Sequence, residues 1–183
     1  CGRDGEAKRT PWLRLDAGSY QLWRDCAGFF EGGWEATGRA FVASAPFLAN
    51  GGCGADLWPD LPWLTEVRSY RAVGDGWELL GVGGVLATLR ADGAPEPIPT
   101  AAEHYARAPE ISDTVRAAFA EPAELPAALS PAAASDLVGR WVPAGGARND
   151  PHAALAADGT WTGSDGCNGA GGACAVGEDG RAL

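Results

Sequence analysis

The stretch "GTWTGSDGCNGAGG", from Gly159 to Gly172, decides the fold of this chain. A short polar segment around Trp161 is followed by the pairs Asp165-Gly166 and Asn168-Gly169. Tight turns between antiparallel strands select such pairs, because Asn, Asp and Gly accept positive φ. We therefore expect a turn here. The functional alternative makes Cys167 a reactive thiol, which needs a neighbouring base or positive charge that this acidic stretch does not supply.

The same layout occurs a second time, in "GSYQLWRDCAGFFEGGW" from Gly18 to Trp34. The two regions align at an offset of 140 residues, and one inserted residue, Asp158, moves the offset to 141. The matched positions are Pro11 with Pro151, Leu15 with Leu155, Tyr20 with Trp161, Cys26 with Cys167, and, further on at an offset of 142, Gly38–Phe41 with Gly180–Leu183. Self-similarity over roughly forty positions indicates two copies of one module.

The two copies differ in extent. The first runs over residues 11–93 and lacks an opening strand, whereas the second runs over residues 136–183 and is incomplete. Residues 1–10 are predicted to be an N-terminal tether, and residues 94–135 a linker rich in Pro and Ala that can form a short helix capped by Ser112. One alternative stays open: residues 137–142 would supply the strand that the first copy lacks, which would make one permuted barrel.

Local patterns in the first copy are mostly those of strands. "SYQLW" (Ser19–Trp23) and "GRAFVASA" (Gly38–Ala45) alternate apolar and polar residues, as a half-buried antiparallel sheet requires. The period changes over Asp60–Tyr70, where apolar residues fall on one helical face. A meander with glycine turns follows over Tyr70–Arg90. The sequence predicts a mainly-β fold: a small antiparallel barrel or sheet with one short helix, followed by a linker and a partial second copy.

Composition excludes several classes of partner. The 183 residues carry a formal net charge of −10, so a phosphate backbone would repel the chain and nucleic acid is not expected as a partner. No apolar run approaches the roughly 18 residues of a membrane-spanning helix. Cysteine spacings contain no CxxC, and His104 and His152 lie in no HExxH frame, so we expect no metal and no cofactor. Both histidines are expected to be exposed and inert.

The first residue carries a localisation signal. A chain that begins at Cys1 and continues with a polar, charged stretch is typical of a bacterial lipoprotein after cleavage of its signal peptide. In that interpretation the Cys1 thiol carries the lipid and anchors the protein at the extracytoplasmic face of the cell membrane; otherwise the protein is secreted. The alternative is a fragment that starts at a cysteine by chance.

These features together resemble the META (HslJ-like) domain family. Leu137, Gly139 and Trp141 match its opening strand pattern, and the Gly166–Asn168 element matches its Gly-Cys-Asn strand end. Further landmarks lie in the first copy, namely Cys53, the Trp63-Leu64 pair, and the terminal hairpin over Gly74–Arg90. Two positions depart from the pattern: Ala27 replaces the family's Asn, and Cys174 stands where the first copy has Trp34.

The resemblance implies a small, twisted antiparallel barrel or sheet with one helix, in a family that is exported or lipid-anchored and not known as enzymes. In an oxidising compartment the four cysteines other than Cys1 are expected to pair. We expect a disulfide between Cys26 and Cys53; the alternative is that both are buried free thiols. The residue that would match Cys53 in the second copy lies beyond residue 183, so the second disulfide is assigned to the two cysteines present there, Cys167 and Cys174.

The leading functional hypothesis is a non-catalytic, lipid-anchored envelope protein that acts through protein contacts or in stress tolerance. The alternative is a barrel that binds a lipid or another small apolar ligand, and a small hydrolase comes last for want of a catalytic constellation. The protein-contact hypothesis and the ligand-binding hypothesis predict different positions for the tryptophan side chains. Five of them either fill a closed core or line an open barrel: Trp12, Trp23, Trp34, Trp63 and Trp77.

Overall fold

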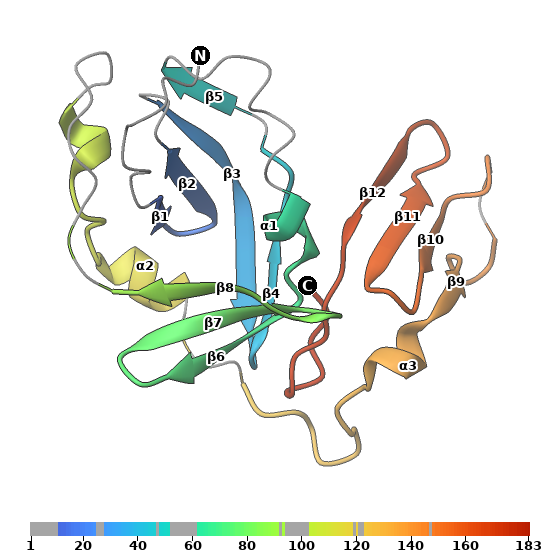
Figure 1. Ribbon diagram of the computed structural model, residues 1–183. Helices are drawn as coiled ribbons and strands as arrows, with labels where there is room; N and C mark the ends of the chain where they lie inside the picture. Colours follow the sequence, from blue (N-terminus) through green and yellow to red (C-terminus); the bar gives the residue numbers. More distant parts are fainter. Residues whose placement is uncertain are drawn as a thin grey trace. The chain divides into compact units, whose positions relative to one another are not determined.

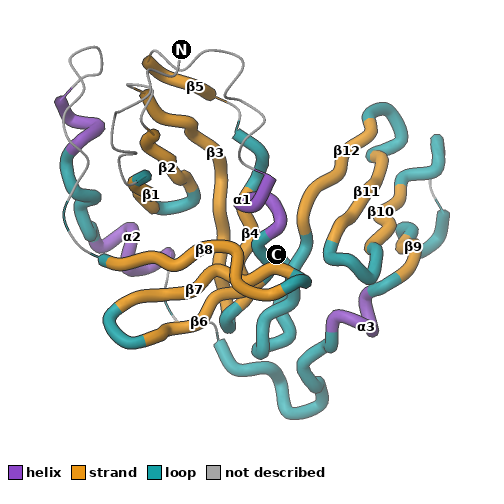
Figure 2. Tube along the Cα trace, in the orientation of Figure 1, coloured by secondary structure: helices purple, strands orange, loops and turns teal. Residues whose placement is uncertain are grey.

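The computed structural model describes residues 11–24, 28–46, 48–51, 62–91, 93, 103–118, 120, 123–146 and 148–183. The chain is mainly β, as predicted, with two antiparallel sheets and a few short helices (Figures 1 and 2). Among the described strands no pairing closes a barrel, because β1 and β8 end the larger sheet without pairing with each other.

The larger sheet is built on one long strand. Its members are β1 (Trp12–Leu15), β2 (Ser19–Arg24), β3 (Gly28–Thr37), β4 (Ala40–Ala43), β5 (Leu48–Gly51), β6 (Ser69–Val73), β7 (Gly76–Gly81) and β8 (Gly84–Arg90). They pair in the order β1-β2-β3-β4-β6-β7-β8, and β5 pairs with β3 beside β2. The first half of β3 therefore binds β2 and β5, and its second half binds β4.

Contacts divide the chain into two compact units that interleave along the sequence. One comprises Cys1–Gly33, Ala45–Leu61 and Asp92–Glu121, and the other comprises Trp34–Ser44, Pro62–Ala91 and Pro122–Leu183. The second unit thus combines the end of the first repeat copy with the whole of the second copy. The predicted domain boundaries at residues 93 and 136 stay a prediction.

The core of the first unit lies along β2 and the start of β3. Tyr20, Leu22, Trp23, Phe29 and Phe30 are buried there, and the rings of Trp23 and Phe29 lie 4.9 Å apart. Burial raises the pKa of Tyr20 to about 12. Aromatic burial on this scale is the main source of stability for a small sheet.

One residue of β2 breaks the expected alternation. Gln21 is buried between Tyr20 and Leu22, and its amide donates to a carboxylate oxygen of Glu31 on the paired strand at 3.4 Å. Both faces of β2 are therefore covered, and a polar side chain on the second face is held by a cross-strand partner.

The core of the second unit contains the apolar face of the predicted helix. Leu64 and Val67 are almost completely buried, together with Phe41 and Leu79. The ring of Trp34 stacks on that of Phe41, with centroids 5.6 Å apart and planes inclined by 23°. This aromatic pair fills the space beside β3 and β4.

The predicted helix over Asp60–Tyr70 is shorter in the structure, where α1 spans Pro62–Glu66. The helix ends early because the backbone of Arg68 forms hydrogen bonds with β7 on one side and β4 on the other. Its N–H donates to the carbonyl of Leu80 at 2.8 Å, and its carbonyl accepts from the N–H of Phe41 at 3.1 Å. These bonds replace the helical ones and begin strand β6. Residues 60 and 61 lie outside the described residues.

The linker contains short helical segments, as its sequence allows. A 3₁₀ turn, η2, spans Glu103–Ala106, and α2 spans Asp113–Ala118. The predicted cap of α2 is confirmed: the Ser112 hydroxyl oxygen accepts from the N–H of Val115 at 3.3 Å.

The smaller sheet follows a short helix, α3 (Ala134–Leu137). Its strands are β9 (Gly139–Trp141), β10 (His152–Leu155), β11 (Thr160–Ser164) and β12 (Gly169–Ala173), paired in the order β12-β11-β10-β9 (Figure 1). Because β9 pairs with β10, it belongs to the second copy. The alternative in which this strand completes the first copy is therefore wrong.

The repeat seen in the sequence reappears as identical pairing. Leu15 pairs with Tyr20, and the matched residues Leu155 and Trp161 pair in the same way. The remaining pairs of the two hairpins also correspond: Trp12–Trp23 with His152–Ser164, Leu13–Leu22 with Ala153–Gly163, and Arg14–Gln21 with Ala154–Thr162. Around Tyr20 and Trp161 the chain therefore adopts the same antiparallel arrangement, and neither stretch is helical.

In the second unit, equivalent turns of the two copies touch. The turn after β3 contains Gly38, and the matching C-terminal turn contains Glu178 and Asp179. The Thr37 hydroxyl donates to Asp179 at 2.7 Å, and the N–H of Glu178 donates to the Gly38 carbonyl at 2.9 Å. Arg39 and Glu178 add an exposed ion pair at 3.0 Å.

Candidate functional site

The stretch around Cys167 is a turn between β11 and β12, as its sequence predicts. One oxygen of Asp165 accepts from the N–H groups of Cys167 and Asn168, each at 2.7 Å. The Ser164 hydroxyl accepts from the N–H of Gly166, which has a φ of 96°. Hydrogen bonds, that from the Asn168 N–H foremost, hold the pKa of Asp165 below its usual value. The Asp, Gly and Asn side chains here build a bend.

The expected pair Cys167 and Cys174 is wrong, because both thiols are free. The extended strand β12 separates them, and its five residues span about 16 Å at about 3.3 Å per residue. A disulfide requires Cα atoms within about 7 Å. Cys1, Cys26 and Cys53 lie outside the described residues, so the predicted lipid site and the Cys26–Cys53 bond stay predictions.

The thiol of Cys174 is buried, and burial raises its pKa although Arg68 acts in the opposite direction. A thiol with a raised pKa is protonated at neutral pH and is a poor nucleophile. Cys167, the residue considered for reactivity in the sequence, is exposed in the turn. Packing rather than reactivity is therefore the role that the structure supports for Cys174.

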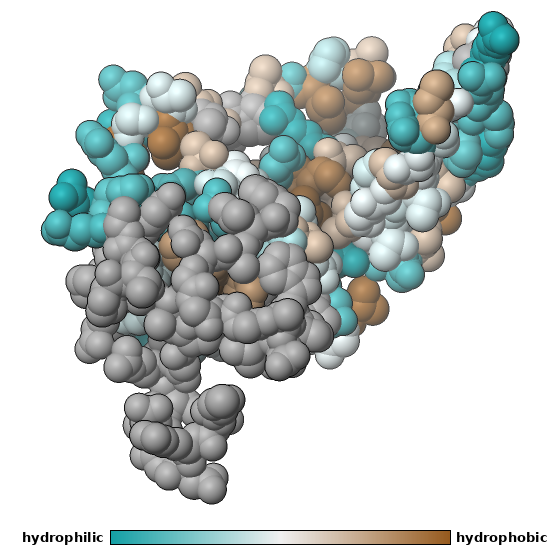
Figure 3. Space-filling view, turned by 90° about the horizontal axis from the view of Figure 1, so that it is seen from above, coloured by the Kyte–Doolittle hydropathy of each residue, from teal (hydrophilic) through white to brown (hydrophobic). Residues whose placement is uncertain are grey.

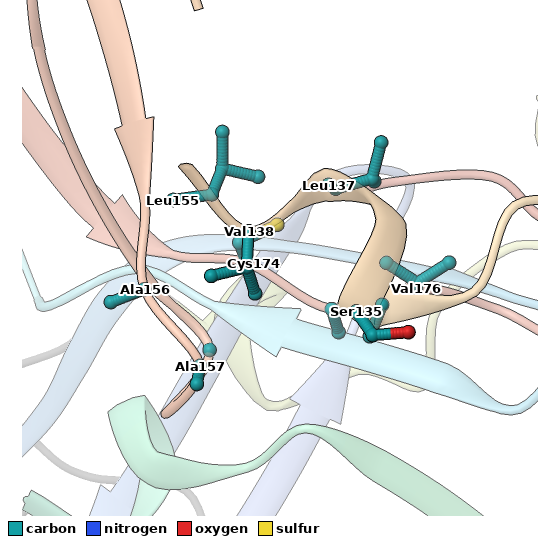
Figure 4. Close-up of a pocket in the computed structure, with 11 residues that line it drawn as sticks. Ser135, Leu137, Val138, Leu155, Ala156, Ala157, Cys174 and Val176 are labelled. Carbon is teal, nitrogen blue, oxygen red and sulfur yellow. The ribbon is translucent and has the colours of Figure 1, made fainter. Parts of the chain in front are cut away.

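Cys174 faces a pocket of about 440 Å³ beside the smaller sheet (Figure 4). Aliphatic side chains from α3, β10 and the C-terminal segment line it, and Figure 4 draws Leu155, Val138 and Cys174 close together. The full lining is Ala134, Ser135, Leu137, Val138, Leu155, Ala156, Ala157, Gly159, Cys174, Ala175 and Val176. None of these side chains is charged. The volume falls within the range of small-molecule sites, roughly 300–1,000 Å³.

The register explains why the second copy has this space. Gly33 is the last residue of β3 that pairs with β2, and Trp34 follows it; Ala173 is the last residue of β12, and Cys174 follows it. Trp34 of the first copy and Cys174 of the second therefore occupy equivalent positions, and the second copy has a small thiol where the first has an indole ring.

The aromatic partner is lost as well. Phe41 lies opposite Ala36 in the first copy, and in the second copy Ala182 lies opposite Val176. The sequence alignment matches Phe41 to Leu183. In the structure the C-terminal turn is one residue longer than the turn after β3, so the residue equivalent to Phe41 is Ala182. A stacked aromatic pair is replaced by a thiol and a methyl group.

An exposed apolar surface adjoins the pocket along β9. Val138, Trp141 and Val142 are 46%, 51% and 56% exposed, and we call these three residues the β9 patch. The Trp141 ring is held in place because its N–H donates to the Leu137 carbonyl at 2.7 Å. Figure 3 colours one face of the molecule by hydropathy and shows brown side chains, singly and in small groups, among pale and teal ones. The sequence marks Trp141 as part of a motif but does not indicate its exposure.

Neither histidine belongs to the pocket lining. His104 is exposed in η2, as expected. His152 begins β10 and is half-buried rather than exposed, and its Nδ1 lies 2.9 Å from the Asp150 carbonyl oxygen. A hydrogen bond from Arg140 at 2.6 Å lowers the pKa of Asp150. In the part of the chain that the structure describes, no group of three or more His, Cys, Asp or Glu residues could hold a metal.

The tryptophans do not form one closed core. Trp23 is buried, whereas Trp77 on β7 is 41% exposed, and Trp12, Trp34 and Trp63 are intermediate. Trp77 lies two residues from the buried Leu79 and therefore on the same face of β7, so its exposure means that this face is less covered at the start of the strand. Of the two interpretations of the five tryptophans, the one in which all of them fill a single closed core is therefore wrong.

No helix among the described residues has the length and apolar character needed to cross a membrane. Comparisons with protein-family models, curated proteins and solved structures find no match to this chain.

Proposed function

We propose that this chain is a non-catalytic META-type protein of the bacterial envelope, anchored through a lipid on Cys1, that acts by binding another envelope protein. The proposal combines the N-terminal cysteine and the family pattern in the sequence with the surface that the second copy presents. Its role in stress tolerance would follow from that partner.

The β9 patch is the observation that carries the proposal. Among the described strands β9 pairs with β10 alone and is therefore an edge strand, and Trp141 at its end and Val142 directly after it are exposed. An edge strand with exposed apolar residues offers both backbone hydrogen bonds and apolar area to a partner. Tryptophan is enriched among residues that dominate the energy of protein interfaces.

The test is affinity capture from envelope extracts of the producing bacterium, with the full chain immobilised. Trp141→Lys is compared with Trp77→Lys, a matched change at a tryptophan of similar exposure on β7. We expect one protein to be captured by the wild type and by Trp77→Lys, and roughly tenfold less of it by Trp141→Lys. Mass spectrometry of the native N-terminal peptide reports a diacylglyceryl group on Cys1 in the same preparation.

Equal capture by both variants would show that β9 is not the interface, and an unmodified Cys1 would show that the protein has no lipid anchor there.

A second candidate function is the binding of a lipid or small apolar ligand, which the aliphatic lining of the pocket favours. Saturable binding of palmitate to the purified protein would support this candidate.

A further inference from the structure

We infer that the pocket beside Cys174 is a receptor for one aromatic side chain, supplied by the partner protein. The inference rests on the proposed function and adds the chemistry of the contact. The pocket occupies the place in the second copy where the first copy carries its own aromatic pair.

The first copy shows what this arrangement accommodates. Trp34 and Ala36 lie on one face of β3, two residues apart, and the ring of Trp34 stacks on Phe41. Cys174 and Val176 hold the equivalent places and both line the pocket. The backbone pairing is kept while the indole is absent, so the strand retains the geometry that seats a planar ring.

The lining suits an uncharged ring. Its members are aliphatic apart from the hydroxyl of Ser135 and the thiol of Cys174, and the hydroxyl points away from Cys174 in Figure 4. A polarisable sulfur beside an aromatic ring makes a favourable contact. A charged group would lose its hydration here without gaining an ionic partner from the lining.

The pocket is continuous with the surface assigned to the partner. Val138 belongs both to the pocket lining and to the β9 patch. Leu137 also lines the pocket, and its carbonyl accepts the hydrogen bond from the Trp141 indole. A segment lying along β9 can therefore place a side chain in the pocket, which is how buried aromatic anchors usually act at interfaces.

Charge narrows the chemistry of the partner segment further. The chain carries a net charge of −10, so a partner of net positive charge would associate faster with it. The predicted partner is therefore a basic protein that presents a tryptophan or phenylalanine.

The experiment titrates N-acetyltryptophanamide, a neutral mimic of a tryptophan in a peptide, into the full chain and follows binding by calorimetry. We compare Cys174→Trp, which restores the residue of the first copy, with Cys167→Trp, the same change at the exposed turn cysteine. Cys174→Trp is expected to raise the melting temperature and to weaken probe binding about tenfold or more, while Cys167→Trp binds like the wild type. Val176→Phe, a change at another residue of the lining, is the second variant if Cys174→Trp does not fold.

Unchanged probe binding in the pocket variants overturns the inference. Saturable palmitate binding in the absence of probe binding also overturns it, because the site would then belong to a lipid. In the capture experiment, loss of the partner with Trp141→Lys but not with Cys174→Trp overturns this inference and leaves the proposed function standing. Failure of capture by the wild type, with the probe still bound, removes the proposed function alone.

Discussion

At the scale of single residues, the two copies share an aromatic ring packed over a glycine. Tyr20 pairs with Gly32 across β2 and β3, and Trp161 pairs with Gly172 across β11 and β12. A Cβ on Gly32 would lie 2.5 Å from the Tyr20 Oη, whereas one on Gly172 would lie 3.2 Å from the Trp161 Nε1. The missing side chain gives the ring a flat surface to cover, which compensates for the weak strand preference of glycine.

Gly32→Ala and Gly172→Ala should therefore differ in their cost. Tyr20 is only 1% exposed and has no room to move, so Gly32→Ala is expected to lower the free energy of unfolding by about 2–3 kcal/mol. The Trp161 ring is only half-buried and can shift, so we expect less than about 1 kcal/mol for Gly172→Ala. Urea denaturation followed by circular dichroism measures both, and equal losses would contradict the packing argument.

At the scale of elements, the β11–β12 hairpin depends on the carboxylate at its bend. The lowered pKa of Asp165 means that the folded hairpin binds its ionised form more strongly than the unfolded chain does. Its contribution to stability is therefore fully present above the ordinary pKa of an aspartate, about 3.9, and is lost as the pH falls through the lower folded value.

Asp165→Ala is expected to lower the melting temperature at about pH 7, and the difference from wild type is expected to shrink at about pH 2, where the carboxylate is protonated. Asp165→Asn serves as the control, because its side-chain oxygen still accepts from the N–H groups of Cys167 and Asn168 but does not titrate. If the difference in melting temperature between the wild type and Asp165→Ala were the same at both pH values, the charge of Asp165 would play no part in stabilising the hairpin.

At the scale of the whole molecule, the second unit is held together partly by the contact between equivalent turns of the two copies. A Cβ on Gly177 would lie 2.8 Å from the Thr37 carbonyl oxygen and 2.5 Å from an oxygen of Asp179. The C-terminal segment can approach β3 this closely only because residue 177 has no side chain.

Gly177→Ala is expected to loosen the C-terminal segment and to cost about 1–3 kcal/mol of stability. Hydrogen exchange measured by mass spectrometry should become faster over residues 174–183. The matched control is Gly83→Ala in the β7–β8 turn, where a Cβ would meet nothing within 4 Å. Unchanged exchange in Gly177→Ala would mean that the turns can separate without loosening this segment.

Features set by neighbours in the sequence could be predicted, and features set across the sheet could not. The turn at Asp165 and the cap at Ser112 depend on a few adjacent residues, so their residue types are sufficient. The end of α1 depends on the Leu80 carbonyl, and the pocket depends on what faces Cys174 and Val176. The alignment did show that Cys174 replaces Trp34, which was the one sequence signal for the pocket.

The outer edge of β12 is unpaired within the described chain, and its glycine and alanine residues carry no charge. This edge has no charged side chain of its own to oppose another strand, so the net charge of −10 is the feature of the chain that opposes pairing between two molecules. Added salt screens that repulsion within roughly 10 Å at 0.1 M. We therefore expect added salt to favour association of two molecules along this edge.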